Sequence, residues 1–133
     1  MILLDTHVVF WATTQPDRLS RAATRAIRAA ERAEGLAISS ISLWELAWLM
    51  AAGRVRVEGS MEGFLDKVAT RAGPVSRCLT SRRRSPCLPL SSRRTFRATR
   101  IDRLIGGTAR AHGLTLVTKD ERMQSSPLLR TTW

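Results

Sequence analysis

Apolar residues along the chain form short continuous runs that alternate with longer stretches of helical spacing. Three runs, residues 2–4, 36–39 and 114–118, have the length and composition of buried strands. The stretches between them predict helices over about residues 6–12, 20–35, 42–53, 60–72 and 101–113. Because helices of this length separate the strands, the pattern predicts an α/β fold with a parallel sheet covered on both faces.

The expected helices present apolar faces that would cover the sheet. In the helix over 60–72 this face is expected to contain Met61, Phe64, Leu65 and Val68. In the helix over 101–113 it is expected to contain Ile101, Leu104, Ile105, Thr108 and Ala109. The helix over 42–53 has apolar residues at Leu43, Ala47 and Met50. Trp44 and Trp48 lie one turn apart beside them, and we expect both in the core rather than on the surface as platforms for bases.

The length of 133 residues indicates a single domain. No apolar run approaches the roughly 20 residues that span a bilayer, and the N-terminus lacks the basic start and cleavage site of a signal peptide. We therefore expect a cytoplasmic protein without a membrane partner. The two cysteines, Cys78 and Cys87, have no partner set that suggests a zinc site or a disulfide framework, so reduced thiols are expected.

Four acidic residues lie at corresponding places in this pattern. Asp5 follows the first strand, and Glu45 lies in the first turn of the helix after the second strand. Asp102 lies in the first turn of its own helix, and Asp120 follows the third strand. In an open parallel sheet the ligand crevice lies beyond the carboxyl ends of the strands, so the four side chains can converge there. Oxygen ligands without His or Cys favour Mg²⁺ or Mn²⁺, and a cation relieves the repulsion between the carboxylates.

Each acid also has a purely structural interpretation. Two of them fit a capping box at a helix start, as Ser42 with Glu45 and Thr99 with Asp102. Asp120 fits an ordinary turn, and Asp5 either caps the following helix or serves a site. The convergence of all four at one predicted edge favours the site.

Three strings carry a resemblance to a known family: ILLDTH, SSISLWELAWL and IDRLIGGTARAHGLTLVTKDERM. They resemble the signature blocks of PIN-domain ribonucleases, most closely the VapC-type toxins of toxin–antitoxin pairs. The resemblance covers residues 1–73 and 101–133. It implies a three-layer sandwich with a central parallel sheet, and a Mg²⁺- or Mn²⁺-dependent endoribonuclease that cuts RNA. It also implies a homodimer and a cognate antitoxin that occupies the active-site groove.

By position, the family's acidic quartet matches Asp5, Glu45, Asp102 and Asp120. The resemblance implies that Asp5 and Asp102 hold one or two cations that activate a water, while Glu45 and Asp120 complete the cage or orient that water. Thr118 matches a polar residue near the metals, although a solvent-exposed strand end is an equal interpretation.

Two histidines are candidates for acid–base chemistry. His7 is expected to face the core, and His112 closes a helix end, where a cation suits the helix dipole. Because a metal ion can activate water by itself, neither histidine is expected to be catalytic.

Residues 74–100 do not follow the pattern. The chain has 22 Lys and Arg against 11 Asp and Glu, and residues 71–101 contribute nine Arg and no acid. The resemblance calls for a strand and an acid-containing helix here, and for an Asp where this chain has Thr99. We interpret 74–100 as a disordered product of a frame slip, with an Arg-rich arm that folds on RNA as the alternative. The second function class that stays open is an inactive relic or a non-catalytic basic RNA-binding protein.

Overall fold

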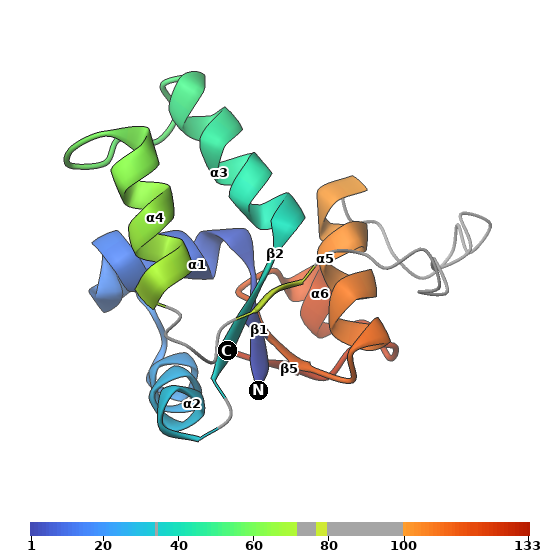
Figure 1. Cartoon of the computed structure of the whole chain (residues 1–133). Coiled ribbons are helices and arrows are strands. Elements are labelled where there is room, and N and C mark those ends of the chain that lie inside the picture. Colours follow the sequence, from blue (N-terminus) through green and yellow to red (C-terminus); the bar gives the residue numbers. More distant parts are fainter. Residues whose placement is uncertain (34, 72–76, 80–99) are drawn as a thin grey trace.

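The computed structural model describes residues 1–33, 35–71, 77–79 and 100–133. In this part of the chain the strands form one five-stranded sheet with the order β3-β2-β1-β4-β5, and every neighbouring pair is parallel (Figure 1). The strands are β1 (Ile2–Leu4), β2 (Leu36–Ser39), β3 (Arg77–Leu79), β4 (Thr115–Val117) and β5 (Thr131–Thr132).

Helices connect successive strands, as a parallel sheet requires. They are α1 (Thr6–Thr14), the short 3-10 helix η1 (Pro16–Arg18), α2 (Arg21–Arg32), α3 (Ser40–Ala51), α4 (Met61–Arg71), α5 (Arg100–Ala111) and α6 (Glu121–Gln124). The predicted α/β fold is confirmed. The short elements η1, β3, α6 and β5 were not predicted, because their sequences contain neither the continuous apolar run nor the helical spacing that identified the other elements.

Two separate cores show that helices cover both faces of the sheet. On one face Leu4, Ile38 and Val117 pack with α1, α2, α3 and α4. On the other face Leu3 and Leu116 pack with α5 and α6. In Figure 1 the two groups of helices lie to the left and to the right of the strands. The predicted three-layer sandwich is therefore confirmed, and alternate residues of each strand serve opposite layers.

The expectation for the tryptophans of α3 is wrong. Trp44 is 56% exposed and Trp48 is 48% exposed, with the guanidinium of Arg54 lying 5.5 Å from the Trp48 ring. The buried side chains of α3 are Ser42 and Leu46. Positions 44 and 48 lie about 200° around the helix from this pair, so they point to the opposite side.

The capping-box interpretation of Ser42 and Glu45 is also wrong. Strand β2 runs directly into α3, which begins at Ser40 with Ser39 as its N-cap. Ser42 therefore lies inside the helix, where its hydroxyl is buried without a hydrogen-bond partner among the described residues. The proposed box of Thr99 with Asp102 lies outside the described residues, since Thr99 is not among them.

Part of the Arg-rich segment belongs to the sheet. Strand β3 pairs with β2, with Cys78 opposite Ile38, and forms one edge of the sheet. The interpretation of the whole segment 74–100 as disordered is therefore wrong for residues 77–79. The interpretations of residues 80–99 as a frame-slip product or as an RNA-binding arm lie outside the described residues.

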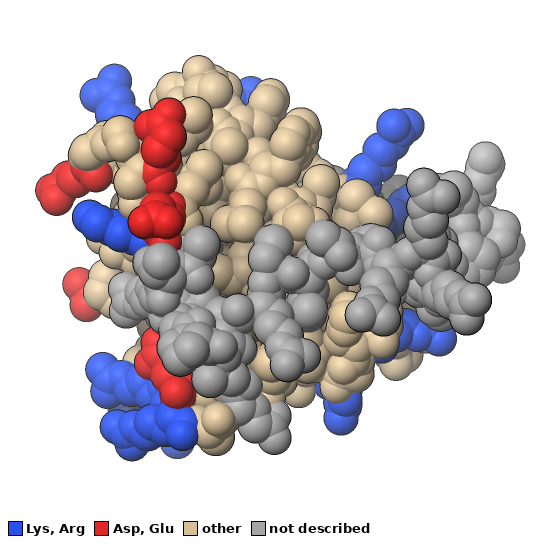
Figure 2. Space-filling model, in the orientation of Figure 1, with Lys and Arg blue, Asp and Glu red and all other residues tan. Residues whose placement is uncertain are grey.

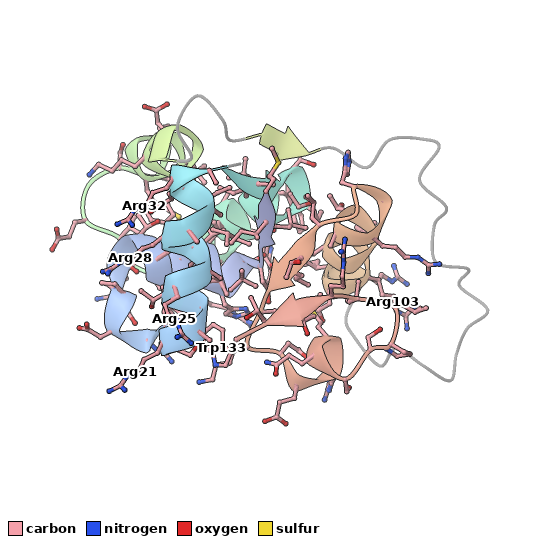
Figure 3. The ribbon with its side chains drawn as sticks, turned by 90° about the horizontal axis from the view of Figure 1, so that it is seen from below. Arg21, Arg25, Arg28, Arg32, Arg103 and Trp133 are labelled. Carbon is pink, nitrogen blue, oxygen red and sulfur yellow. The ribbon has the colours of Figure 1, made fainter. Side chains whose placement is uncertain are left out.

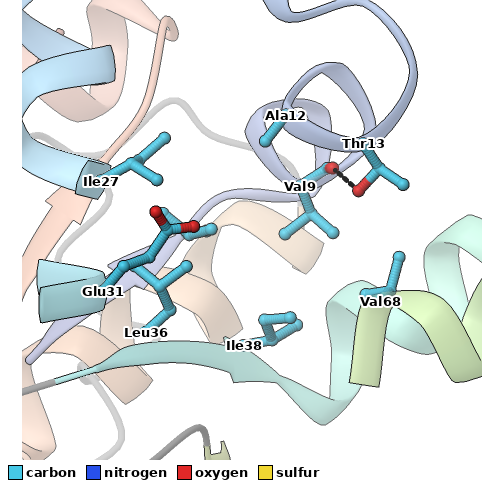
Figure 4. Close-up of a pocket in the computed structure, with 9 residues that line it drawn as sticks. Val9, Ala12, Thr13, Ile27, Glu31, Leu36, Ile38 and Val68 are labelled. Carbon is cyan, nitrogen blue, oxygen red and sulfur yellow. Dashed lines mark hydrogen bonds between the residues drawn. The ribbon is translucent and has the colours of Figure 1, made fainter. Parts of the chain in front are cut away.

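A cavity of about 20 Å³ lies within the first core, between α1, α2, β2 and α4 (Figure 4). Its lining is mainly apolar, from Val9, Ile27, Ile38 and their neighbours. The Thr13 hydroxyl at its edge already donates to the Val9 carbonyl oxygen at 2.9 Å. Glu31 also lines the cavity (Figure 4), but a volume of about 20 Å³ has room for little more than one water, so the cavity is a small packing gap and not a site for a larger ligand.

Within the described residues, each helix is too short or too polar to span a bilayer.

Two adjacent glycines of α5 provide a test of the packing. A Cβ at Gly107 would meet no atom within 4 Å, whereas a Cβ at Gly106 would lie 3.2 Å from Cδ1 of Leu129. We expect Gly107→Ala to raise the free energy of unfolding by about 0.5–1 kcal/mol, because alanine loses less backbone entropy in a helix. Gly106→Ala is the matched control, and it should raise the free energy of unfolding by less than Gly107→Ala does, or lower it. Urea denaturation measures both, and equal gains would contradict this packing of α5.

Candidate functional site

The central strands end together at one edge of the sheet. Leu4 pairs with Ile38 on one side and with Val117 on the other. The next residue of each strand is therefore Asp5, Ser39 or Thr118, and all three side chains are buried. This is the carboxyl edge, where parallel sheets bind their ligands.

A single hydroxyl links two of the predicted site residues. The Thr118 hydroxyl donates to Oδ2 of Asp5 at 2.7 Å and accepts from the backbone N–H of Asp120 at 3.0 Å. The backbone N–H of Thr6 donates to Oδ1 of Asp5 at 2.7 Å. Thr118 has no exposed surface, so its interpretation as a solvent-exposed strand end is wrong.

Asp5 and Asp120 both serve as helix caps as well. Asp5 is the N-cap of α1, and Asp120 is the N-cap of α6. Oδ1 of Asp120 accepts from the backbone N–H groups of Arg122 at 2.7 Å and Met123 at 3.1 Å. Capping leaves lone pairs on both carboxylates, so the structural interpretation and a ligand role are compatible.

Burial raises the pKa of the Asp5 carboxyl above its ordinary value of 3.8. The negative charge of Asp102 raises it further, whereas the hydrogen bonds from Thr118 and Thr6 and the nearby His7 act in the opposite direction. An anionic Asp5 is thus disfavoured in the protein alone, and a cation beside it would reverse this balance.

The other two predicted acids come from helices. Asp102 lies half-buried in the first turn of α5 and acts on Asp5 through its charge. Glu45 lies half-buried in α3, and within the described residues its carboxylate forms no hydrogen bond or ion pair. In the same part of the chain, no three His, Cys, Asp or Glu side chains are close enough to form a metal cluster. Within the described residues, the structure thus links Asp5, Thr118 and Asp120 by hydrogen bonds and places Asp102 where its charge acts on Asp5.

An open groove of about 510 Å³ lies over this edge, lined by Asp5, His7, Trp11, Lys119, Asp120, Glu121 and Arg122. The expectation that His7 faces the core is wrong, because His7 is exposed on the groove side of α1. The buried residues Val8 and Val9 define the core side of this helix and turn His7 outward. His112 lies just beyond the end of α5, as predicted, and its side chain is exposed.

Sequence reasoning did not identify Trp11 as a groove residue. Its ring lies 5.9 Å from that of Trp133 and 5.8 Å from that of His7. Two cations also approach it, with the Arg18 guanidinium at 4.6 Å and the Lys119 ammonium at 5.7 Å from the ring centroid. The spacing of His7 and Trp11, one helical turn apart and just after Asp5, could have indicated a shared face. Nothing in the pattern connects Trp133 to them.

A family model for the PIN domain matches residues 2–126. Ribonuclease VapC22 of Mycobacterium tuberculosis is 39% identical over 124 residues, which is 93% of this chain and 90% of that protein.

Three solved structures share the fold. VapBC2 from Rickettsia felis, bound to a DNA fragment from its promoter, has a TM-score of 0.73 at 20% identity and covers 99% of this chain and 98% of its own. DNA-bound VapBC from Salmonella typhimurium has a TM-score of 0.68 at 21% identity, and the match covers 99% of this chain and 98% of that chain. FitAcB from Neisseria gonorrhoeae has a TM-score of 0.65 at 20% identity, and the match covers 100% of this chain and 97% of that chain.

The raised pKa of Asp5 predicts a pH-dependent stability. Below 3.8 the carboxyl is protonated in both the folded and the unfolded chain. As the pH rises from 3.8 through the raised folded value, the unfolded chain ionises first, so stability is lost. In metal-free buffer at pH 7 we therefore expect Asp5→Asn to raise the melting temperature, with the increase shrinking as the pH falls toward 3.8.

Thermal melts of both proteins across this pH range measure the effect. Asp17→Asn, at an exposed position in η1, is the matched control and should change the melting temperature little at any pH. A lower melting temperature for Asp5→Asn at pH 7 would show that the hydrogen bonds from Thr118 and Thr6 outweigh the cost of burial.

Proposed function

Because the chain belongs to the PIN-domain family, we propose that it is an endoribonuclease that acts as the toxin of a toxin–antitoxin pair. The 39% identity to a ribonuclease, extending over nearly the whole of both chains, supports a nuclease activity. The observation that carries the proposal is the buried Asp5 carboxylate, fixed by Thr118 at the carboxyl edge of the sheet beside the charge of Asp102.

We further propose that the site uses Mg²⁺ or Mn²⁺. The donors at this edge are carboxylate oxygens, which suit hard divalent cations. Asp5 and Asp102 would hold the ion, with Glu45 and Asp120 in supporting positions. The raised pKa of Asp5 fits a site built for a cation, because burial and the Asp102 charge both oppose an unpaired anion there. When bound, such a cation would supply an activated water and neutralise charge on the leaving oxygen.

The protein's own groups would position the reaction. Thr118 holds the Asp5 carboxylate in one orientation and ties it to the turn at Asp120. Lys119 and Arg122 line the same groove and can bind the phosphates on either side of the scissile bond. Since the groove is open, it can admit a single strand of RNA.

The partners we propose are the RNA substrate, a cognate antitoxin and a second copy of this chain. Two solved structures of the same fold are VapBC assemblies bound to DNA, which supports an antitoxin partner. The exposed Trp44 and Trp48 of α3, and Leu104 of the adjoining α5, at 43% exposure, support a homodimer. Large exposed apolar side chains are typical of surfaces that another protein covers.

The test of the activity is incubation of the purified protein with total RNA, with and without Mg²⁺ or Mn²⁺. We expect metal-dependent cleavage that Asp5→Asn and Asp102→Asn each abolish, because each removes a charged ligand. Asp17→Asn is the control and should cleave normally. Unchanged cleavage by both site variants would contradict the site, and RNA binding without cleavage by the wild type would favour a relic or a non-catalytic RNA-binding protein.

Thr118 permits a finer test of positioning. Thr118→Val removes the hydroxyl that orients Asp5 and should lower cleavage and Mn²⁺ affinity roughly 10- to 100-fold, as for other groups that orient metal ligands. Thr118→Ser keeps the hydroxyl and should retain most of both. Calorimetry with Mn²⁺ measures affinity independently of cleavage, and a Val variant with normal affinity would exclude this role.

A further inference from the structure

Helix α2 presents a stripe of four arginines to solvent. Arg21, Arg25, Arg28 and Arg32 follow one another at intervals of four, three and four residues, and all four are exposed. This spacing keeps them within a narrow arc on one side of the helix, opposite the buried Ala23, Ile27 and Ala30. Figure 3 shows the four side chains leaving the helix in sequence. The stripe is about 16 Å long, from the rise of 1.5 Å per residue.

The stripe is unfavourable for the helix itself. Like charges three or four residues apart repel each other, and a cation in the first turn, such as Arg21, opposes the helix dipole. The first turn of α2 contains no acidic residue to compensate. Within the described residues, none of the four guanidinium groups has an ion-pair partner. A bound polyanion would relieve this repulsion.

The stripe continues toward the groove of the candidate site. A hollow lined by Leu19, Arg21, Thr24 and Arg25 lies at the start of α2. Arg18, just before it in η1, lies over the ring of Trp11, which lines the groove beside Asp5. Helix α2 also packs against β5, which leads into Trp133 beside Trp11. In Figure 2 the Lys and Arg surface gathers at the lower left, where Figure 1 places α2.

We propose that the α2 stripe binds the phosphate backbone of the RNA, with the strand running from the groove past Arg18 along the helix. This inference rests on the proposed ribonuclease function and adds where the substrate lies outside the site. A row of exposed positive charges without large apolar side chains among them suits a polyanion. A stable protein interface would need apolar or aromatic anchors at its centre, and the stripe offers none.

The experiment measures the binding of a labelled oligouridylate by fluorescence anisotropy in EDTA, over a series of salt concentrations. The variant replaces Arg25 and Arg28 with Gln, which preserves helix propensity. The matched control replaces Arg56 and Arg110, two exposed arginines in the loop after α3 and in α5, and removes the same charge. We expect the α2 variant to bind roughly 10- to 25-fold more weakly near 0.1 M salt, with the slope of log affinity against log salt smaller by about 1.4. The control should stay within about twofold of the wild type.

Two results would overturn the proposal. If the control variant lost as much RNA affinity as the α2 variant, net charge alone would account for the binding. Normal RNA binding by the α2 variant, combined with lost binding of polyglutamate, would assign the stripe to an acidic protein. Thermal melts check folding, and the α2 variant should melt at or above the wild-type temperature because repulsion is removed.

The outcome is separable from that of the proposed function. If the wild type fails to cleave RNA with Mg²⁺ or Mn²⁺ but the α2 variant still loses affinity for RNA, the RNA-binding role of the stripe is supported and the ribonuclease proposal fails. If the wild type cleaves RNA and the α2 variant binds RNA normally in EDTA, the RNA-binding role of the stripe is wrong and the ribonuclease proposal is unaffected.

Discussion

The buried carboxylate of Asp5 is the constraint on which the site depends. It lies 5% exposed at the end of the central strand, where an unpaired charge would cost several kcal/mol. The hydroxyl of Thr118, 113 residues away in the chain, donates to it, and this bond is possible because β1 and β4 are neighbours in parallel register. The sheet therefore places the carboxylate, and the threonine fixes its orientation.

The same hydroxyl couples the site to the second core. It accepts from the backbone of Asp120, whose side chain caps α6, and α6 inserts the fully buried Met123 between the sheet and α5. A displacement of the turn after β4 would thus disturb the hydrogen bond to Asp5 and the packing of the core together. This coupling explains how a turn of ordinary composition can hold a site residue in one position.

The net charge of a segment does not show where its charged side chains lie on the surface. The first 70 residues carry eight basic and eight acidic side chains, so their sum is neutral, and the excess of positive charge falls in residues 71–101. Yet four of those eight basic residues line one side of α2. Because a polyanion responds to local potential and not to the sum, a neutral half of the chain can still present a basic surface.

The periodicity of the sequence by itself determined the alternation of strands and helices, and the position of Asp5, Asp102 and Asp120 at strand ends and helix starts. These are local properties, set by side-chain pattern and capping chemistry within a few residues. Tertiary structure decided the direction of Trp44, Trp48 and His7, the contact of Trp11 with Trp133, and the burial of Thr118. Each of these depends on which face of an element meets a distant partner, and periodicity within one element carries no information about that partner.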